Sequence, residues 1–170
     1  MTIAVQVRGL RKSYKAGVGS CLAAVEVLRG IELTLCAGEA IGIVGSANSG
    51  KSTLLLCLAG ILSPDAGEIA WFDRRDRAVA GTRAFYHVAR ADLRRVAPAP
   101  EPRLHLLDLD SSDDLHVAPW IETRRKQGDA IVVAARAAHS GTPLDRCCIL
   151  DAGYLRPASG LATRVAESTS

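Results

Sequence analysis

Residues 45–53 read GSANSGKST, which is a complete phosphate-binding loop of the form GxxxxGK[ST]. The glycines allow the backbone to wrap around a phosphate chain with its N–H groups pointing inward. Lys51 supplies a positive charge for the β- and γ-phosphates, and the hydroxyl of Ser52 can hold Mg²⁺. The sequence therefore predicts a nucleoside triphosphate and Mg²⁺ on this loop. The expected binding residues are Gly45, Ser46, Ala47, Asn48, Ser49, Gly50, Lys51, Ser52 and Thr53.

The segments on either side of the loop have the order that this motif requires. Ala40–Val44 (AIGIV) is a short apolar run, typical of a buried parallel strand. Ser52–Ile61 reads as an apolar helix, whose N-terminus would face the phosphates. A strand, the loop and a helix in this order indicate an α/β phosphate-binding core.

The composition describes one globular domain. With 170 residues, of which 48% are hydrophobic, the chain is long enough to bury a core and too apolar to be disordered. A formal net charge of +3 does not by itself indicate nucleic-acid binding. No stretch approaches the ~20 apolar residues of a membrane span, and the N-terminus lacks the layout of a signal peptide. The five cysteines have no metal-ligand spacing, so we expect a cytoplasmic protein with small buried thiols.

The N-terminal part of the chain predicts antiparallel strands. Ile3–Val7 and Ile31–Leu35 alternate between apolar and polar residues, as half-exposed strands do, and Lys15–Gly19 reads as the loop between them. Ile69–Phe72 reads as a further strand. We expect these strands to form a separate β subdomain beside the phosphate-binding core.

The middle of the chain is basic and weakly periodic. Asp73–Arg95 is rich in arginine, and a helix around Ala84–Arg95 is the expectation there. Its basic residues suit a solvated helix face, or else a docking surface for an acidic partner. Val96–Pro102 (VAPAPEP) reads as a linker, because proline breaks helices and restricts the residue before it.

The C-terminal part alternates again between strands and a helix. Apolar runs predict strands at Leu104–Asp108, Ala130–Ala135 and Cys147–Leu150, and Pro119–Gln127 predicts a helix with proline in its first turn. Such alternation implies a parallel sheet that binds its ligand at the carboxyl ends of the strands. The expected fold is α/β, with a mainly parallel sheet flanked by helices and an added antiparallel β subdomain.

Asp108 stands at the carboxyl end of one of these strands. A carboxylate in this position beside a phosphate-binding loop can hold Mg²⁺ on the phosphates, as the Walker B aspartate does. Asp110 lies two residues further on the same strand face and is the alternative ligand. Asp108 could also simply end the strand and begin a turn.

In this order, the segments resemble the nucleotide-binding subunits of ATP-binding cassette (ABC) transporters. The resemblance rests on four segments: VRGLRKSYKAG, VLRGIELTLCAGEAIGIVGSANSGKSTLLLCLAGILSPDAGEIAW, PRLHLLDLDSS and DRCCILDAGYL. It implies that the nucleotide is ATP, that Tyr14 stacks on the adenine, and that Ser52 and Asp108 hold Mg²⁺. It also implies a membrane permease or a second ATP-binding subunit as partner, which would place the chain at the inner face of the membrane, with no role for nucleic acid.

The resemblance also implies one nucleotide-binding domain over residues 1–170. Residues 1–72 would form the β subdomain and P-loop half, and residues 73–103 a short arginine-rich insert with its linker. Residues 104–156 would form the Walker B half, followed by a tail at residues 157–170. The interval between Lys51 and Asp108 is too short for the family's helical subdomain, which we expect to be reduced or absent.

Several motifs of the family are missing. The two glutamines, Gln6 and Gln127, both lie outside the interval where the family has its glutamine loop, and no two glycines are adjacent as the LSGGQ signature requires. Leu109 replaces the catalytic glutamate after the Walker B aspartate. Arg136 occupies the register of the switch histidine, and His139 lies three residues away from it.

These departures predict a subunit that binds ATP–Mg²⁺ but hydrolyses it weakly or not at all, with no catalytic residue of its own. Two alternatives stay open. The chain could be a working transporter ATPase completed by a partner chain or by Asp110, or a different P-loop enzyme such as a small-molecule kinase.

Overall fold

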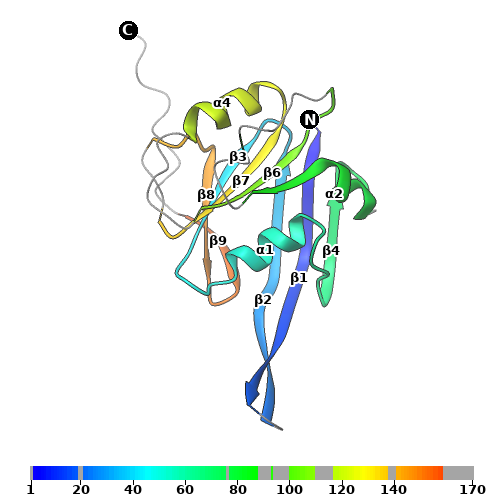
Figure 1. Ribbon diagram of the computed structural model, residues 1–170, viewed down its shortest axis with the longest axis vertical. Coiled ribbons are helices and arrows are strands. Elements are labelled where there is room, and N and C mark those ends of the chain that lie inside the picture. The colour runs from blue at the N-terminus through cyan, green and yellow to red at the C-terminus, as the bar shows by residue number, and fades with distance from the viewer. Residues whose placement is uncertain are drawn as a thin grey trace.

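The computed structural model describes residues 2–18, 21–75, 77–87, 93, 100–109, 117–137 and 141–158 (Figure 1). Two sheets form the molecule. A three-stranded antiparallel sheet has the order β2-β1-β4, and a six-stranded sheet has the order β5-β6-β7-β3-β8-β9. The first contains β1 (Ile3–Val18), β2 (Cys21–Cys36) and β4 (Ala66–Trp71). The second contains β3 (Ala40–Val44), β5 (Ala84–His87), β6 (Leu104–Asp108), β7 (Ala130–Ala135), β8 (Arg146–Asp151) and β9 (Tyr154–Pro157).

The six-stranded sheet is parallel except at one edge. The pairs β5–β6, β6–β7, β7–β3 and β3–β8 are parallel, and only β9 runs antiparallel to its neighbour β8. Strand β3 is therefore central, and all five residues of its apolar segment are paired on the β7 side. This arrangement confirms the expected fold class, a mainly parallel α/β core with an antiparallel β subdomain and few helices.

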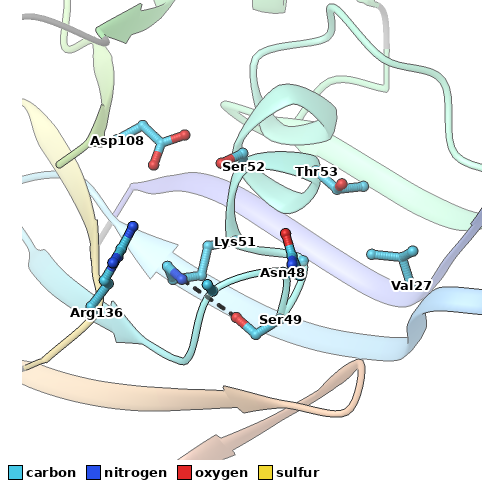
Figure 2. Close-up of a pocket in the computed structure, with 10 residues that line it drawn as sticks. Val27, Asn48, Ser49, Lys51, Ser52, Thr53, Asp108 and Arg136 are labelled. Atoms are coloured by element: carbon cyan, nitrogen blue, oxygen red, sulfur yellow. Dashed lines mark hydrogen bonds between the residues drawn. The ribbon is translucent and has the colours of Figure 1, made fainter. Parts of the chain in front are cut away.

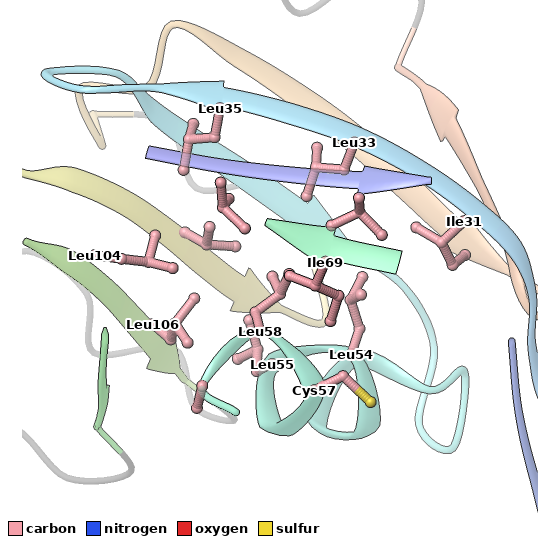
Figure 3. Close-up of a cluster of buried hydrophobic side chains, with 14 of the residues drawn as sticks. Ile31, Leu33, Leu35, Leu54, Leu55, Cys57, Leu58, Ile69, Leu104 and Leu106 are labelled. Carbon is pink, nitrogen blue, oxygen red and sulfur yellow. The ribbon is translucent and has the colours of Figure 1, made fainter. Parts of the chain in front are cut away.

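Helix α1 (Lys51–Leu58) packs between the two sheets. Figure 3 shows its leucines directed into a cluster shared with strands of both sheets, including Ile69 of β4 and Leu104 and Leu106 of β6. Helix α4 (Ala118–Lys126) covers the opposite face of the six-stranded sheet, where Ile121 packs with a second cluster that contains Leu107 of β6. Among the described residues, no helix has the length and apolar character needed to cross a membrane.

The hairpin of β1 and β2 is longer than the sequence suggested. Pairing continues from Lys15↔Ala24 to Val18↔Cys21, so the expected loop at Lys15–Gly19 is wrong as far as Val18, and Gly19 lies outside the described residues. Cross-strand hydrogen bonds satisfy the backbone of these residues, although their side chains show no clear strand pattern. Strand β4 pairs with β1 only from Val5 to Arg11, and the rest of the hairpin projects beyond it (Figure 1).

The helix expected at Ala84–Arg95 is wrong over its first four residues, Ala84–His87. Helix α2 (Arg77–Arg83) ends where that helix should begin, and Ala84–His87 forms the strand β5 at the edge of the sheet. Parallel pairing with β6, from Ala84↔Leu104 to His87↔Leu107, provides the hydrogen bonds that fix this strand. Of the remaining expected helix, Leu93 is the one residue that the structure describes, and it is helical. The described part of the expected Val96–Pro102 linker is residues 100–102.

Candidate nucleotide-binding site

The P-loop joins the carboxyl end of β3 to the N-terminus of α1. Gly45 sits against the neighbouring strands: its N–H donates to the carbonyl of Ala135 at 3.2 Å, and an added Cβ would lie 2.4 Å from the carbonyl oxygen of Leu150. Gly50 immediately precedes the helix with φ 101°, a left-handed conformation that favours glycine. Asn48 also has a left-handed backbone (φ 62°), which asparagine tolerates. The loop therefore forms a tight cradle that larger residues would fill.

Lys51 lies inside this cradle. Its side chain is buried, and its Nζ donates to the carbonyl oxygens of Gly45 at 2.7 Å and Ser46 at 2.8 Å. A third contact, to Oγ of Ser49, is 3.5 Å long (Figure 2). The ammonium group is thus held at the base of the loop, where it can attract phosphate oxygens.

A cavity of about 410 Å³ opens over the loop. Its walls come from the P-loop, from β2 and from the carboxyl ends of β6 and β7. The lining residues are Val27, Ala47, Asn48, Ser49, Gly50, Lys51, Ser52, Thr53, Asp108 and Arg136. Eight of the sequence-predicted binding residues, counting Asp108, therefore lie on one cavity, and Gly45 and Ser46 lie beneath it as acceptors for Lys51.

Strand alternation directs Asp108 into this cavity. Leu104 and Leu106 face the cluster around α1, and Asp108 continues that face at the end of β6. Figure 2 shows its carboxylate turned toward Ser52, the second residue of α1. Asp110, the alternative metal ligand, lies outside the described residues.

Tyr86 of β5 holds the Asp108 carboxylate from the side. Its hydroxyl donates a 2.8 Å hydrogen bond to Oδ2 of Asp108. Burial and this bond to the carboxylate raise the pKa of Tyr86 above its ordinary value, so the phenol stays protonated and remains a donor. No motif in the sequence indicates this contact, because it depends on the parallel pairing of β5 with β6.

The residues on the cavity fit a nucleotide with Mg²⁺. A carboxylate (Asp108) and a hydroxyl (Ser52) are the oxygen ligands that Mg²⁺ prefers, and the ion commonly combines one or two such ligands with phosphate oxygens. In the described part of the chain, no group of three or more His, Cys, Asp or Glu side chains could hold a metal. Ser52 and Asp108 are the described oxygen ligands that this cavity offers to such an ion.

Leu109 and Arg136 occupy different environments. Leu109 packs against the cluster beneath α4, and its N–H donates to the carbonyl of Ala134 at 2.9 Å, so its side chain faces away from Asp108. Arg136 is exposed and lines the cavity just after β7 (Figure 2). A guanidinium here adds a second positive charge to the cavity wall. His139 lies outside the described residues.

Tyr14 lies on β1 near the helix end of the P-loop. Its side chain is 41% exposed, and its hydroxyl lies 3.4 Å from Oγ1 of Thr53. Val25 is its partner on β2, and Val27, two residues further along that strand, is the residue that lines the cavity. Tyr14 is therefore next to Thr53 at the edge of the cavity but is not one of the residues that line it, and Nζ of Lys12 lies 5.9 Å from the centre of its ring.

Comparisons with known proteins agree with this geometry. The model of the family described as ABC transporter matches residues 28–127. The lipoprotein-releasing system ATP-binding protein LolD of Ruegeria sp. (strain TM1040) is 41% identical over 92 residues, which cover 54% of this chain and 38% of LolD. The pyoverdine export ATP-binding/permease protein PvdT of Pseudomonas syringae pv. tomato is 47% identical over 64 residues, 38% of this chain and 9% of PvdT. The chain thus spans well under half of the length of these relatives.

Solved structures share the fold. The dimeric structure of MJ0796, a bacterial ABC transporter cassette, has a TM-score of 0.68 and covers 89% of this chain and 96% of its own. The structure of cbiO1 from Clostridium perfringens has a TM-score of 0.65 and covers 91% of this chain and 87% of its own. Sequence identities are 15% and 14%, so these likenesses concern the fold.

Proposed function

The chain belongs to the ABC transporter family, and from this premise we propose that it is an ATP-binding subunit that holds ATP–Mg²⁺ at its P-loop and hydrolyses it slowly or not at all. The observation that carries the proposal is the cavity on which Lys51, Ser52 and Asp108 converge. A cation, a hydroxyl and a carboxylate at the ends of α1 and β6 are the groups that a nucleoside triphosphate and its metal need.

Each group has a distinct task in binding. The N–H groups of the loop and the N-terminus of α1 attract the phosphate oxygens. Lys51 adds a positive charge, and its ammonium group is held in place by hydrogen bonds to two carbonyl oxygens. Ser52 and Asp108 would hold Mg²⁺, which when bound neutralises phosphate charge. Tyr14 would stack on the adenine from the open side of the cavity.

The described residues on this cavity include no group suited to activate water. Among the described residues that line it, Asp108 alone is a carboxylate, and metal binding would occupy it. Leu109 faces the α4 cluster, and a leucine cannot accept a hydrogen bond from water. Phosphoryl transfer depends on placing the nucleophile in line with the phosphate, so slow turnover follows.

We further propose a protein partner: a membrane permease or a second ATP-binding subunit, which would hold the chain at the cytoplasmic face of the membrane. LolD and PvdT are named as parts of release and export systems, which supports a role in transport. Arg74 and Arg75, between β4 and α2, are exposed; Arg75 is paired with Glu68 at 3.1 Å, and Arg74 offers a positive charge to acidic groups on a permease. Loss of permease binding on charge reversal at Arg74 and Arg75 would support this surface.

Thermal unfolding with and without ATP–Mg²⁺ tests the binding proposal. A ligand present at 100 times its Kd stabilises a protein by about 2.7 kcal/mol, which is several degrees of Tm for a domain of this size. Lys51→Ala should abolish the shift, whereas Lys126→Ala, an exposed lysine at the end of α4, should keep it. Equal Tm values for the wild type in the presence and absence of millimolar ATP–Mg²⁺ would refute the proposal.

Hydrolysis is measured on the same samples. Rapid phosphate release by the wild type, lost in Lys51→Ala, would instead identify a working ATPase.

A further inference from the structure

Tyr86 donates a hydrogen bond to the Asp108 carboxylate, and the two residues come from neighbouring strands. The phenol of Tyr86 is half-buried against the cluster around α1, which fixes its ring. Its hydroxyl reaches Oδ2 of Asp108 at 2.8 Å. The contact therefore connects the edge strand β5 with the carboxylate at the end of β6.

We propose that Tyr86 is a positioning residue for the metal site: it holds Asp108 in the orientation that presents its other oxygen, Oδ1, to Mg²⁺ beside Ser52. This inference rests on the proposed function of Asp108 as a metal ligand. It assigns a role to a residue outside the P-loop that no sequence motif identified.

The physical reason is the freedom of an aspartate at a strand end. The carboxylate of Asp108 is only partly buried, so without a partner it could rotate between the cavity and solvent. One hydrogen bond from a fixed phenol removes most of this freedom and uses only one of the two oxygens. Residues that orient metal ligands in this way typically change metal affinity by about 10–100-fold when they are replaced.

The register of the sheet makes this contact possible. Tyr86 is opposite Leu106, and both have side chains on the α1 face of their strands. Asp108 is two residues beyond Leu106 on the same face, so the long tyrosine side chain reaches it at the end of the sheet. A shorter side chain at residue 86 would not span this distance.

The test replaces only the hydroxyl. For Tyr86→Phe, we expect Mn²⁺ binding to the ATP complex, measured by electron paramagnetic resonance, to weaken about tenfold. Binding of ATP in the presence of EDTA should stay within about twofold of the wild type, because the phosphate contacts of the P-loop do not involve Tyr86. Tyr154→Phe, an exposed tyrosine on β9, is the matched control and should change neither value.

A double-mutant cycle with Asp108→Asn separates positioning from a general structural effect. If Tyr86 acts through Asp108, Tyr86→Phe should have no further effect on Mn²⁺ affinity in the Asp108→Asn background. Unchanged Mn²⁺ affinity in Tyr86→Phe, or an equal loss in both backgrounds, would overturn the inference. Failure of the wild type to bind Mn²⁺–ATP would instead overturn the proposed function, so the two failures are distinguishable.

Discussion

Asp108 and Leu109 are neighbours in the chain, yet their side chains serve opposite faces of the six-stranded sheet. Asp108 lines the cavity over the P-loop, and Leu109 packs with the cluster beneath α4. Strand alternation explains the separation, because Leu109 directly follows β6 and its N–H still pairs with Ala134 of β7, so its side chain points to the side opposite Asp108. Leu109 therefore adds apolar packing on the α4 side and contributes no polar group to the cavity.

Introducing a glutamate at residue 109 should not create an ATPase. Leu109→Glu would place a carboxylate against the α4 cluster, so we expect the free energy of unfolding to fall by about 1–3 kcal/mol. Turnover of ATP should stay far below the usual ~1–10³ s⁻¹ of enzymes. Urea unfolding and phosphate release measure the two effects. Leu109→Met is the control, and rapid hydrolysis by Leu109→Glu would show that the side chain reaches the nucleotide.

Gly45 should tolerate no side chain. In Gly45→Ala the added Cβ would lie 2.4 Å from the Leu150 carbonyl oxygen and 2.6 Å from Oγ of Ser49, so the P-loop must shift. We expect a loss of at least 1–3 kcal/mol in stability, typical of overpacking, together with loss of ATP binding. Gly81→Ala in α2 is the matched control, because its Cβ would meet nothing within 4 Å and alanine favours helix by ~1 kcal/mol. Equal stability of the two variants would contradict the packing argument.

Arg136 should help to distinguish ATP from ADP. Its guanidinium lines the cavity with Lys51 and can attract the terminal phosphate. Because the group is exposed, we expect Arg136→Ala to reduce ATP affinity by roughly 1 kcal/mol, or about fivefold, with a smaller effect on ADP. Isothermal titration with both nucleotides measures the ratio. The same loss for both, or a similar loss in Arg156→Ala on β9, would exclude a role at the terminal phosphate.

Tyr14 should contribute to binding of the adenine base and not to binding of the phosphates. Its exposed ring stands beside the cavity entrance, where stacking on a base contributes on the order of 1 kcal/mol or more. Tyr14→Ala should therefore weaken ATP about fivefold or more, and Tyr14→Phe should not, because it keeps the ring. Inorganic triphosphate lacks a base and should bind all three proteins alike. Equal losses of ATP and triphosphate in Tyr14→Ala would remove the stacking role.

Acid should destabilise the protein through His105. This side chain is fully buried on the α4 face of β6, where its Nε2 lies 3.2 Å from Oδ2 of Asp129 and its Nδ1 lies 3.2 Å from Nε2 of His87. Burial lowers the pKa of His105, and the nearby Arg124 and Arg103 act in the same direction against the opposing effect of Asp129. The folded protein therefore holds His105 neutral.

Stability should fall as the pH drops below the unfolded histidine pKa of about 6.5, because the unfolded chain then binds a proton that the folded chain does not. The slope is at most ~1.4 kcal/mol per pH unit for one group. Although burial opposes it, hydrogen bonds from His105 and the Arg103 N–H lower the pKa of Asp129, which adds a further loss only near pH 4 and below. Urea unfolding at pH 7.5 and 5.5 should show the loss, and His105→Gln should reduce it. An unchanged slope in His105→Gln would contradict this assignment.

Local patterns in the sequence were sufficient to predict the strands that are buried on both faces of the six-stranded sheet. The strands at Leu104–Asp108 and Ala130–Ala135 have the predicted bounds, and α4 begins one residue before the predicted Pro119. Short apolar runs and a proline at a helix start carry this information within a few residues. The P-loop could be predicted for a different reason. Its residues each meet a steric or electrostatic requirement of phosphate binding, so the motif can be identified from the sequence alone.

Only the tertiary structure decided which residues meet. Ala84–His87 forms a strand because it pairs with β6. Its own sequence is as compatible with a helix as with a strand. This pairing places Tyr86 in contact with Asp108, 22 positions away in the chain, and His87 in contact with His105, 18 positions away. The sequence by itself determined where a phosphate can bind, since the loop folds on local geometry. The groups that surround the phosphate were decided by sheet order and register, because hydrogen bonds between distant strands fix them.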